Sequence, residues 1–435
     1  MEPTIPLTHG SFNGLNIAPN ILEVLDREKF TVPTPIQASC IPSGVEGKDI
    51  IGIAQTGTGK TLAFGIPMIQ RVIQNAGHGL IILPTRELAL QVDETFQRIG
   101  RSLGIRTAVL IGGASMGLQK QMIRNRPNVV IATPGRLIDH LEHRTITLNT
   151  VKILVLDEAD RMLDMGFAPQ INKILLMVPK DRQTMLFSAT MPTEIVKIAT
   201  THMQLPLRVE VAPAGTTADR VEQEVFIVNK ADKIRLLEHI LKESKGSILV
   251  FSRTKYGAKK ITHAVAVMGH KSAEIHSNRS LAQRKEALEG FRNGRYRVLI
   301  ATDIASRGID VTGIELVINY DLPDDPSDYV HRIGRTARAG REGKAISFVE
   351  PSQSGAIRNI ERLVRKQITR KPLPTSLPVA VVMPRIARDE ERFGSRPPQG
   401  QNGRPSFSRG GRGGDHKRGA RSGGGGRSGG RRKSY

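Results

Sequence analysis

At 435 residues, the chain can form two domains of ordinary size and a tail, and its 39% hydrophobic content suffices for real cores. The formal net charge of +23 favours a polyanionic partner. A single cysteine, Cys40, excludes an internal disulfide framework and a cysteine-rich metal site, and is typical of a reducing compartment. No signal-peptide pattern is present and no apolar run approaches the roughly 18 residues of a membrane helix, so we expect no membrane partner and a cytoplasmic location.

A glycine-rich loop follows an apolar strand within residues 49–61, and a helical apolar pattern comes next. At Gly57 and Gly59, backbone N–H groups can turn toward an anion that a side chain would block. The helix beginning near Lys60 directs its positive dipole end at the same anion, and the Thr61 hydroxyl can hold Mg²⁺. The stretch predicts a phosphate-binding loop. A plain Gly/Thr turn is the alternative, which the order of strand, loop and helix disfavours.

Apolar strand-like runs alternate with helical patterns from residue 50 to about residue 209. The predicted strands are residues 50–53, 80–83, 107–111, 129–132, 153–156 and 184–187. Such alternation indicates a parallel sheet covered by helices on both faces. We therefore expect a doubly wound α/β domain at residues 41–212, after an N-terminal segment at residues 1–40.

The alternation restarts after a turn-prone stretch, which we interpret as a linker at residues 213–221. The predicted strands of a second doubly wound α/β domain, residues 222–380, are 224–228, 248–251, 298–301, 316–319 and 345–349. A helix at residues 280–291 opens with Ser280 and Gln283 in capping-box spacing and ends before Gly294. This second domain has no phosphate loop of its own.

Apolar periodicity ends near Arg385, where Arg/Gly and Ser/Gly runs begin. Residues 391–435 contain ten Arg, two Lys and two acidic residues. Such a segment cannot bury enough apolar surface to offset the entropy of ordering it. We expect a disordered basic tail at residues 381–435.

Two carboxylates follow one of the predicted buried strands. Asp157 stands where Mg²⁺ beside a phosphate loop needs a partner, and Glu158 can polarise a water for in-line attack on the γ-phosphate. An acidic loop at a strand end is the alternative. Ser188 and Thr190 follow another strand, where a helix cap is the default interpretation. Beside Asp160, their hydroxyls would connect the metal site to the interdomain cleft.

Arginines recur every three residues at Arg332, Arg335 and Arg338. On nearly one helical face they repel each other unless an anion faces them. A solvated basic face is one interpretation. The other is an arginine finger that reaches the γ-phosphate across the domain gap, which would explain why the second domain needs no phosphate loop.

Phe30 and Gln37 precede the phosphate loop. An aromatic ring can stack on a base, and a glutamine amide can donate and accept at an adenine edge at once. Packing and a surface turn are the alternative for both residues.

Taken in order, these motifs resemble those of DEAD-box RNA helicases, and the resemblance covers residues 12–364. The matching motifs are Phe12, Phe30, residues 33–37 (the Q motif), 54–61, 84–89, Gly112, Gly113, 133–136, 157–160, 188–190, 250–254, Arg284, 301–310 and 331–340. So many motifs in one order make the resemblance very specific. The short N-terminus and the Arg/Gly-rich tail are most similar to bacterial members of the RhlE type.

The resemblance implies two RecA-like domains that bind ATP and Mg²⁺. The implied catalytic residues are Lys60, Asp157, Glu158, Arg335 and Arg338. The implied nucleotide-binding residues are Phe30, Gln37, Ala54, Gln55, Thr56, Gly57, Thr58, Gly59, Lys60, Thr61, Gly308 and Asp310, with Thr61 and Asp157 at the metal. The residues implied in coupling the domains are Asp160, Ser188, Thr190 and His331.

RNA is the implied partner at the opposite edge. The implied contacts are Pro84, Thr85, Arg86, Gly113, Thr133, Arg136, Arg253, Arg284 and Thr302. Small groups, backbone and arginines suit a sugar-phosphate backbone, so we expect sequence-independent binding with a steep salt dependence.

Four positions depart from the commoner family pattern. Lys29, Ser277 and Ala337 stand where glycine is usual, and Leu281 stands where glutamine is usual. None of them removes a group with a catalytic role, but Leu281 removes one polar contact on the RNA side.

The sequence thus predicts an ATP-dependent RNA helicase or remodeller of RNA–protein complexes, in which ATP and RNA together close the cleft. Alternatives are an ATP-gated RNA clamp, which the intact catalytic set disfavours, and a DNA helicase, which Asp-Glu-Ala-Asp with Gln37 disfavours. We expect a monomer, with ribosomal or RNA-degradation assemblies as candidate partners. The tail is interpreted as an RNA tether, with a solubilising linker as the alternative.

Overall fold

The computed structural model describes residues 10–55, 57–75, 77–211, 221–303, 313–337, 343–375 and 377–378. Both sheets described below belong to one compact unit, Met1–Met383. The predicted tail lies outside the described residues. Of the predicted linker, only Val221 is described, as the first residue of a strand.

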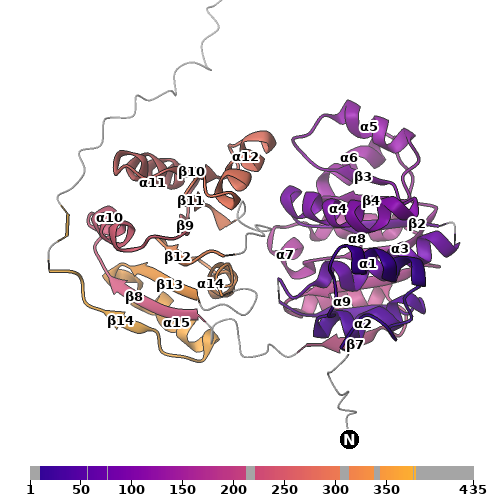
Figure 1. Ribbon diagram of the computed structural model, residues 1–435, viewed down its shortest axis with the longest axis horizontal. Helices are drawn as coiled ribbons and strands as arrows, with labels where there is room; N and C mark the ends of the chain where they lie inside the picture. Colours follow the sequence, from indigo (N-terminus) through magenta and orange to yellow (C-terminus); the bar gives the residue numbers. More distant parts are fainter. Residues whose placement is uncertain are drawn as a thin grey trace, which may run out of the picture. The chain divides into compact units, whose positions relative to one another are not determined.

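The first lobe, which we define as the part of the chain carrying β1 to β7, is built on a seven-stranded parallel sheet in the order β3-β4-β2-β5-β6-β1-β7 (Figure 1). Its strands are β1 (Ile50–Ile53), β2 (His78–Ile82), β3 (Thr107–Leu110), β4 (Val129–Ala132), β5 (Val151–Leu156), β6 (Gln183–Ser188) and β7 (Leu207–Glu210). Its helices are α1 (Pro19–Arg27), α2 (Pro35–Val45), α3 (Lys60–Asn75), α4 (Arg86–Gly100), α5 (Met116–Arg124), α6 (Pro134–Glu142), α7 (Ala159–Asp164), α8 (Ala168–Met177) and α9 (Thr193–His202), with a short 3₁₀ turn η1 (Arg101–Leu103).

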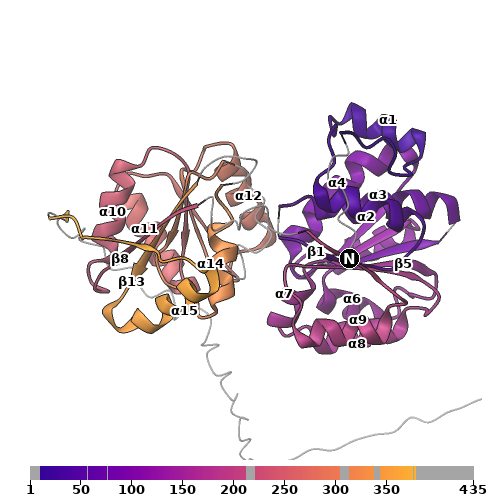
Figure 2. The same ribbon diagram turned by 90° about the horizontal axis from the view of Figure 1, so that it is seen from below.

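Helices cover both faces of this sheet, with α1 to α4 on one face and α6 to α9 on the other (Figure 2). Side chains alternate between faces along a strand. Ile50 therefore joins the core under α1 to α4, while its neighbour Ile51 joins the core under α6 to α9. Two hydrophobic cores on one sheet are what the predicted doubly wound fold requires.

The second lobe, which we define as the part carrying β8 to β14, has its own seven-stranded parallel sheet in the order β10-β11-β9-β12-β13-β8-β14. Its strands are β8 (Val221–Ile227), β9 (Ile248–Phe251), β10 (Ser272–Ile275), β11 (Val298–Ala301), β12 (Leu316–Asn319), β13 (Gly343–Val349) and β14 (Thr369–Lys371). Its helices are α10 (Lys233–Glu243), α11 (Lys255–Val267), α12 (Leu281–Arg292), α14 (Pro326–Ile333) and α15 (Ser354–Val364), with a 3₁₀ turn η2 (Pro351–Gln353).

Local sequence explains where several helices begin. Ser280 caps α12 by accepting a hydrogen bond from the Gln283 backbone N–H at 3.3 Å, and the Gln283 side chain accepts one from the Ser280 N–H at 3.0 Å. The predicted capping box is therefore confirmed. Proline occupies the first turn of α1, α2, α6, α8 and α14, where its missing N–H costs no helical hydrogen bond.

The parallel arrangement places the sequence motifs together. In the first lobe, the phosphate loop, Thr85, Thr133, Asp157 and Ser188 all stand at or just after the carboxyl end of a strand. The carboxyl ends of parallel strands share one edge of a sheet, which is where doubly wound folds bind their ligands. The candidate site is therefore sought at this edge.

Candidate active site

The phosphate loop connects β1 to α3. Gly57 and Gly59 have φ angles of 87° and 90°, which side chains rarely allow. A Cβ on Gly59 would clash with Nε2 of Gln37, so a larger residue there would displace the Gln37 amide in addition to straining the backbone. The Thr58 hydroxyl donates to the Gln55 carbonyl at 2.8 Å and tightens the loop. Thr56 lies outside the described residues.

Lys60 is the first residue of α3, and its side chain is only 6% exposed. Its ammonium donates a hydrogen bond to the Ala54 carbonyl at 3.0 Å. A lysine ammonium has three N–H donors. The remaining donors stand at the N-terminus of α3, where the helix dipole also favours an anion.

Gln37 fastens the phosphate loop to the start of α2. Its amide oxygen accepts a hydrogen bond from the Thr34 backbone N–H at 2.9 Å, and its amide nitrogen donates one to the Gly59 carbonyl at 2.9 Å. The side chain is 4% exposed. Contact of Gln37 with adenine stays a prediction; its hold on the phosphate loop is a feature that the sequence did not reveal.

Phe30 packs against the core under α1 to α4. The Arg98 guanidinium lies 5.3 Å from the centre of its ring, and Arg98 is held by Glu28 at 3.0 Å. Lys29, which precedes Phe30, has a φ of 62°. A left-handed backbone explains why glycine is usual at this position in the family that the sequence resembles.

Asp157 and Glu158 follow β5 and are both 3% exposed. Burial raises the pKa of Asp157 to about 6, with Lys60 opposing the rise and Glu158 adding to it. Glu158 has a φ of 52°, and its backbone N–H donates to Oδ1 of Asp157 at 2.9 Å. Burying two adjacent carboxylates is costly without a cation, so this pair suits a metal ion.

The Glu158 carboxylate is held by charge alone. Its Oε2 lies 3.8 Å from Nε of Arg161, and within the described residues neither of its oxygens receives a hydrogen bond. A buried carboxylate with free lone pairs can accept a hydrogen bond from a water and orient it.

Mg²⁺ fits the donors that are present. It prefers hard oxygen ligands, and it usually keeps several waters while taking one or two carboxylates and substrate phosphates. Asp157 and the Thr61 hydroxyl supply such donors beside the phosphate loop. No cluster of three or more His, Cys, Asp or Glu side chains suited to a metal occurs in the described part of the chain.

Asp160 links the acidic motif to the end of β6. Its Oδ2 accepts from the backbone N–H groups of Ala189 and Thr190, at 3.1 and 2.8 Å, and from the Thr190 hydroxyl at 2.9 Å. Its own backbone N–H donates to the Ser188 hydroxyl at 3.2 Å. The predicted proximity of Asp160 to Ser188 and Thr190 is therefore observed.

The RNA-side candidates of the first lobe lie at the same sheet edge as the phosphate loop, and not at the opposite edge that the resemblance implied, because they too follow the carboxyl ends of parallel strands. Thr85 caps α4 by accepting from the Leu88 N–H at 3.3 Å, and Arg136 donates to the Ala114 carbonyl at 3.0 Å. Gly113 has a φ of 76°, and a Cβ there would lie 2.2 Å from the Arg86 guanidinium. A side chain at this position would displace Arg86.

The RNA-side candidates of the second lobe already have protein partners. Arg253 donates to the Leu322 carbonyl at 3.2 Å, and the Thr302 backbone N–H donates to the Ile275 carbonyl at 3.2 Å. Arg284 forms a 2.9 Å ion pair with Glu87, and both side chains are buried. Glu87 was not singled out by its sequence, although it stands within the matched motif at residues 84–89.

The repeating arginines have different environments. Arg332 is 2% exposed and forms two hydrogen bonds, of 2.6 and 2.7 Å, with the Asp303 carboxylate. It also donates to Asn319 at 3.1 Å, and it stacks 4.9 Å from the centre of the Phe251 ring. This arginine is therefore an internal anchor, which the regular spacing did not reveal.

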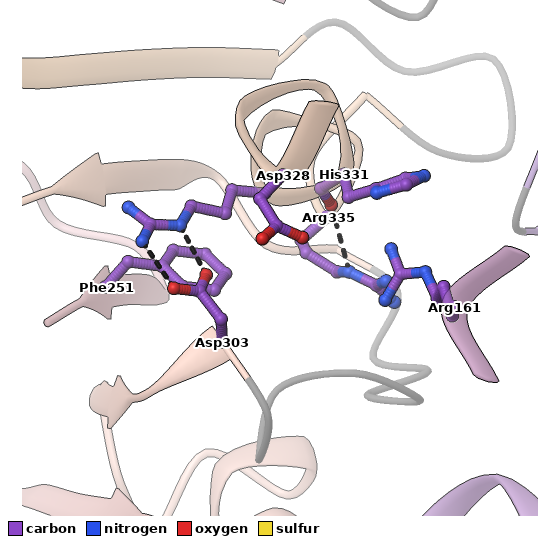
Figure 3. A pocket seen from close by; sticks show the side chains of 7 residues that line it. Arg161, Phe251, Asp303, Asp328, His331 and Arg335 are labelled. Atoms are coloured by element: carbon purple, nitrogen blue, oxygen red, sulfur yellow. Dashed lines mark hydrogen bonds and ion pairs between the residues drawn. The ribbon is translucent and has the colours of Figure 1, made fainter. Parts of the chain in front are cut away.

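Arg335 is 3% exposed, and its Nε donates to the His331 carbonyl at 3.3 Å (Figure 3). Together with Arg161 and Asp328 it lines a small pocket of about 10 Å³. Three other predicted site residues, Gly308, Asp310 and Arg338, lie outside the described residues.

A phosphate loop between β1 and α3, an acidic pair after β5 and two parallel seven-stranded sheets define an ATPase with two RecA-like lobes. The DEAD/DEAH box helicase family matches residues 34–198, and the helicase conserved C-terminal domain matches residues 232–340. One match lies in each lobe.

Curated relatives belong to the same class of helicases as the family matches. The chain is 43% identical over 379 residues to the ATP-dependent rRNA helicase RRP3 of Debaryomyces hansenii, covering 86% of this chain and 80% of that protein. It is 41% identical over 368 residues to the DEAD-box ATP-dependent RNA helicase CshA of Bacillus subtilis, covering 84% and 74%.

Among solved structures, S. cerevisiae Dbp5 bound to RNA and ADP BeF3 matches with a TM-score of 0.74 and 33% identity, covering 83% of this chain and 96% of that one. The chain therefore belongs to the DEAD-box family of ATP-dependent RNA helicases, and the predicted tandem RecA-like fold is confirmed. No helix in the described ranges is long and apolar enough to cross a membrane.

Proposed function

We propose that the chain uses ATP binding and hydrolysis to separate short RNA duplexes locally, or to remodel RNA–protein complexes, by closing its two lobes around ATP and RNA. The proposal rests on one observation: the catalytic candidates and the RNA-side candidates of the first lobe share the sheet edge formed by the carboxyl ends of the strands. Lys60, Asp157 and Glu158 stand at this edge with the RNA-side candidates Thr85 and Thr133. ATP and RNA bound at one edge can each favour the same closed state, and so tighten each other.

The roles follow from the chemistry of each side chain. Lys60 holds the terminal phosphates, and the buried Glu158 orients the attacking water. Bound through Thr61 and Asp157, Mg²⁺ would neutralise charge on the phosphates. Gln37 and Phe30 hold adenine beside the phosphate loop.

The second lobe completes the site. Arg335 and Arg338 supply positive charge to the γ-phosphate, and Gly308 and Asp310 contact the nucleotide. The remaining nucleotide contacts come from Ala54, Gln55, Thr56, Gly57, Thr58 and Gly59. Asp160, Ser188, Thr190 and His331 couple the lobes.

RNA binding rests on groups that suit a sugar-phosphate backbone, and it is therefore sequence-independent. The contacts are Pro84, Thr85, Arg86, Gly113, Thr133, Arg136, Arg253, Arg284 and Thr302. In this proposal the Arg284–Glu87 ion pair must open, or share its arginine, when RNA binds.

The proposed organisation is an N-terminal segment at residues 1–40, RecA-like domains at 41–212 and 222–380, a linker at 213–221 and a basic tail at 381–435. The Arg/Gly-rich tail supports a place in the bacterial RhlE-type subgroup. The single cysteine supports a reducing compartment, and we propose a cytoplasmic monomer. Ribosomal or RNA-degradation assemblies are its candidate partners.

The test is RNA release from a Glu158→Gln variant. Removing the carboxylate that orients water should leave ATP bound and RNA trapped, whereas Lys60→Ala should abolish turnover. Lys48→Ala is the matched lysine control, because Lys48 is exposed and pairs with Glu46. If the Glu158→Gln protein released RNA as fast with ATP as without it, closure would be disproved.

Phosphate release assayed with RNA, with DNA and with neither separates the alternatives. RNA should stimulate release and DNA should not. An ATP-gated clamp would show no stimulation, and a DNA helicase would respond to DNA.

A further inference from the structure

A cavity of about 350 Å³ opens in the first lobe at the edge opposite to the candidate active site. It is lined by His78, Val130 and Val151, which stand at or next to the first residues of β2, β4 and β5. The phosphate loop and the acidic motif stand at the other ends of the strands of this sheet. Because β2 rises about 3.3 Å per residue, its five residues separate the two edges by about 15 Å.

The interior of the cavity is apolar and its rim is polar. Leu80, Val130 and Leu148, all buried, contribute hydrocarbon surface, to which Ile123 and Ile146 add. The rim includes the threonines 145, 147 and 150, and no residue that lines the cavity is acidic. A volume in this range with a few polar groups around an apolar interior is typical of small-molecule sites.

Two arginines, Arg126 and Arg144, complete the rim. Each directly follows the C-cap residue of a helix, α5 or α6, and each has a φ of 50°. Glycine is the usual residue at this left-handed position. Lys29 and Arg365 share this conformation at other helix ends, so the backbone angle alone identifies no site.

The charges of Arg126 and Arg144 are not neutralised by the surrounding protein. Neither guanidinium has an ion pair or hydrogen bond to a residue that the structure describes. Nearby carboxylates are paired elsewhere, since Glu142 binds Lys173 at 2.7 Å and Asp139 lies 3.3 Å from Arg136. Two guanidinium groups and hydroxyls beside hydrocarbon suit an anionic head on an apolar body.

We propose that this cavity is a second ligand site of the first lobe, which binds a small organic anion with a carboxylate or phosphate head and an apolar body. Arg126 and Arg144 bind the head, and the hydrocarbon interior of the cavity takes the body. Because the cavity lies at the far edge of the sheet, its ligand does not compete with ATP or RNA.

The probe for the test is 8-anilinonaphthalene-1-sulfonate, an organic anion whose fluorescence rises in apolar sites. The full-length protein is titrated with it, and then with the neutral analogue N-phenyl-1-naphthylamine. The probe should bind an Arg126→Asn/Arg144→Asn variant at least roughly tenfold more weakly, because two charge-assisted hydrogen bonds are removed. Asparagine is chosen because it tolerates a left-handed backbone. The neutral analogue should not distinguish the variant from wild type.

Two further variants distinguish probe binding in the cavity from nonspecific attraction of the probe to the positive charge of the protein. Arg101→Gln/Arg124→Gln removes the same charge from exposed arginines that do not line the cavity, and should leave probe binding unchanged. Thr147→Phe fills the rim at an exposed position and should weaken binding without disturbing the fold. Saturating ATP or poly(U) should not displace the probe.

Competition identifies the head group. Octanoate represents carboxylates and phenyl phosphate represents phosphates, and the effective competitor should act on wild type but not on the Asn/Asn variant. The proposal is overturned if the Asn/Asn variant binds the probe as tightly as wild type. It is also overturned if ATP or poly(U) displaces the probe from wild type, or if neither octanoate nor phenyl phosphate displaces it.

Discussion

The amide nitrogen of Gln37 donates a hydrogen bond to the carbonyl oxygen of Gly59 at 2.9 Å, which ties the start of α2 to the phosphate loop. Gln37 is 22 residues before Gly59 in the chain. The same side chain caps α2 by accepting from the Thr34 N–H. A movement of α2 that displaces Gln37 therefore breaks or shifts a hydrogen bond to the phosphate loop.

Replacing Gln37 with alanine should weaken ATP binding by about tenfold and lower the free energy of unfolding by about 2 kcal/mol, because two partly buried backbone groups lose their partner. ATP affinity is measured with a fluorescent analogue and stability by urea denaturation. Gln121→Ala is the matched control, since Gln121 is exposed on α5, away from the phosphate loop. It should change neither the free energy of unfolding nor ATP affinity. Unchanged ATP affinity in Gln37→Ala would contradict the proposed role.

Arg332→Ala should destabilise the second lobe by roughly 3 kcal/mol, because it removes the guanidinium that pairs with the Asp303 carboxylate and donates a hydrogen bond to the buried Asn319. The Asp303 side chain is 23% exposed, so water screens part of its charge. The expected loss of unfolding free energy therefore lies at the lower end of the range for breaking a buried ion pair. Chemical denaturation measures the change. Arg332→Lys should not restore stability, since lysine lacks the planar fork.

The matched control for Arg332 is Arg358→Ala. Arg358 is exposed on α15, and its removal should change stability by less than about 0.5 kcal/mol. Equal losses in the two variants would show that Arg332 is not an internal anchor.

Cys40 should resist thiol reagents in the folded protein at pH 8 and react fully in denaturant. Its side chain is fully buried, and burial raises its pKa to about 12. In the unfolded chain the thiol ionises near its ordinary pKa, so the folded state binds the extra proton and stability falls as pH rises from about 9 toward 12. A Cys40→Ala variant should lose this part of the pH dependence. Rapid labelling of the native protein would show that Cys40 is accessible.

The strands that sequence patterns predicted are those whose side chains are mostly buried. Each of the four residues of β4, β9, β11 and β12 is buried, and the predicted bounds of these strands are confirmed. The pattern missed β7, β10 and β14, and all three lie at sheet edges. An edge strand has neighbours on one side only, so it need not be continuously apolar; β14 is fully exposed.

Backbone angles explain two departures from the family pattern. Ala337 has a φ of 55° and Lys29 a φ of 62°, so both stand in the left-handed region where glycine is favoured. The sequence alone shows that a non-glycine residue stands at each of these positions, but not that its backbone is left-handed. Periodicity also grouped Arg332 with Arg335, although Arg332 is paired with Asp303, 29 residues earlier. Such pairings depend on tertiary packing, which the spacing of residues along the chain does not predict.

Deleting the residues after Glu391 should weaken RNA binding and lower its salt dependence while leaving ATP affinity unchanged. The deleted segment carries ten Arg and two Lys but only one acidic residue, Asp415. Each RNA phosphate that the protein no longer neutralises should reduce the slope of log K against log salt by about 0.7 on single-stranded RNA. A full-length variant with its ten tail arginines changed to glutamine separates charge from chain length, and should behave like the deletion. If both proteins bound RNA as tightly as wild type at every salt concentration, the tail would be only a solubilising linker, and the folded lobes would supply the whole electrostatic attraction.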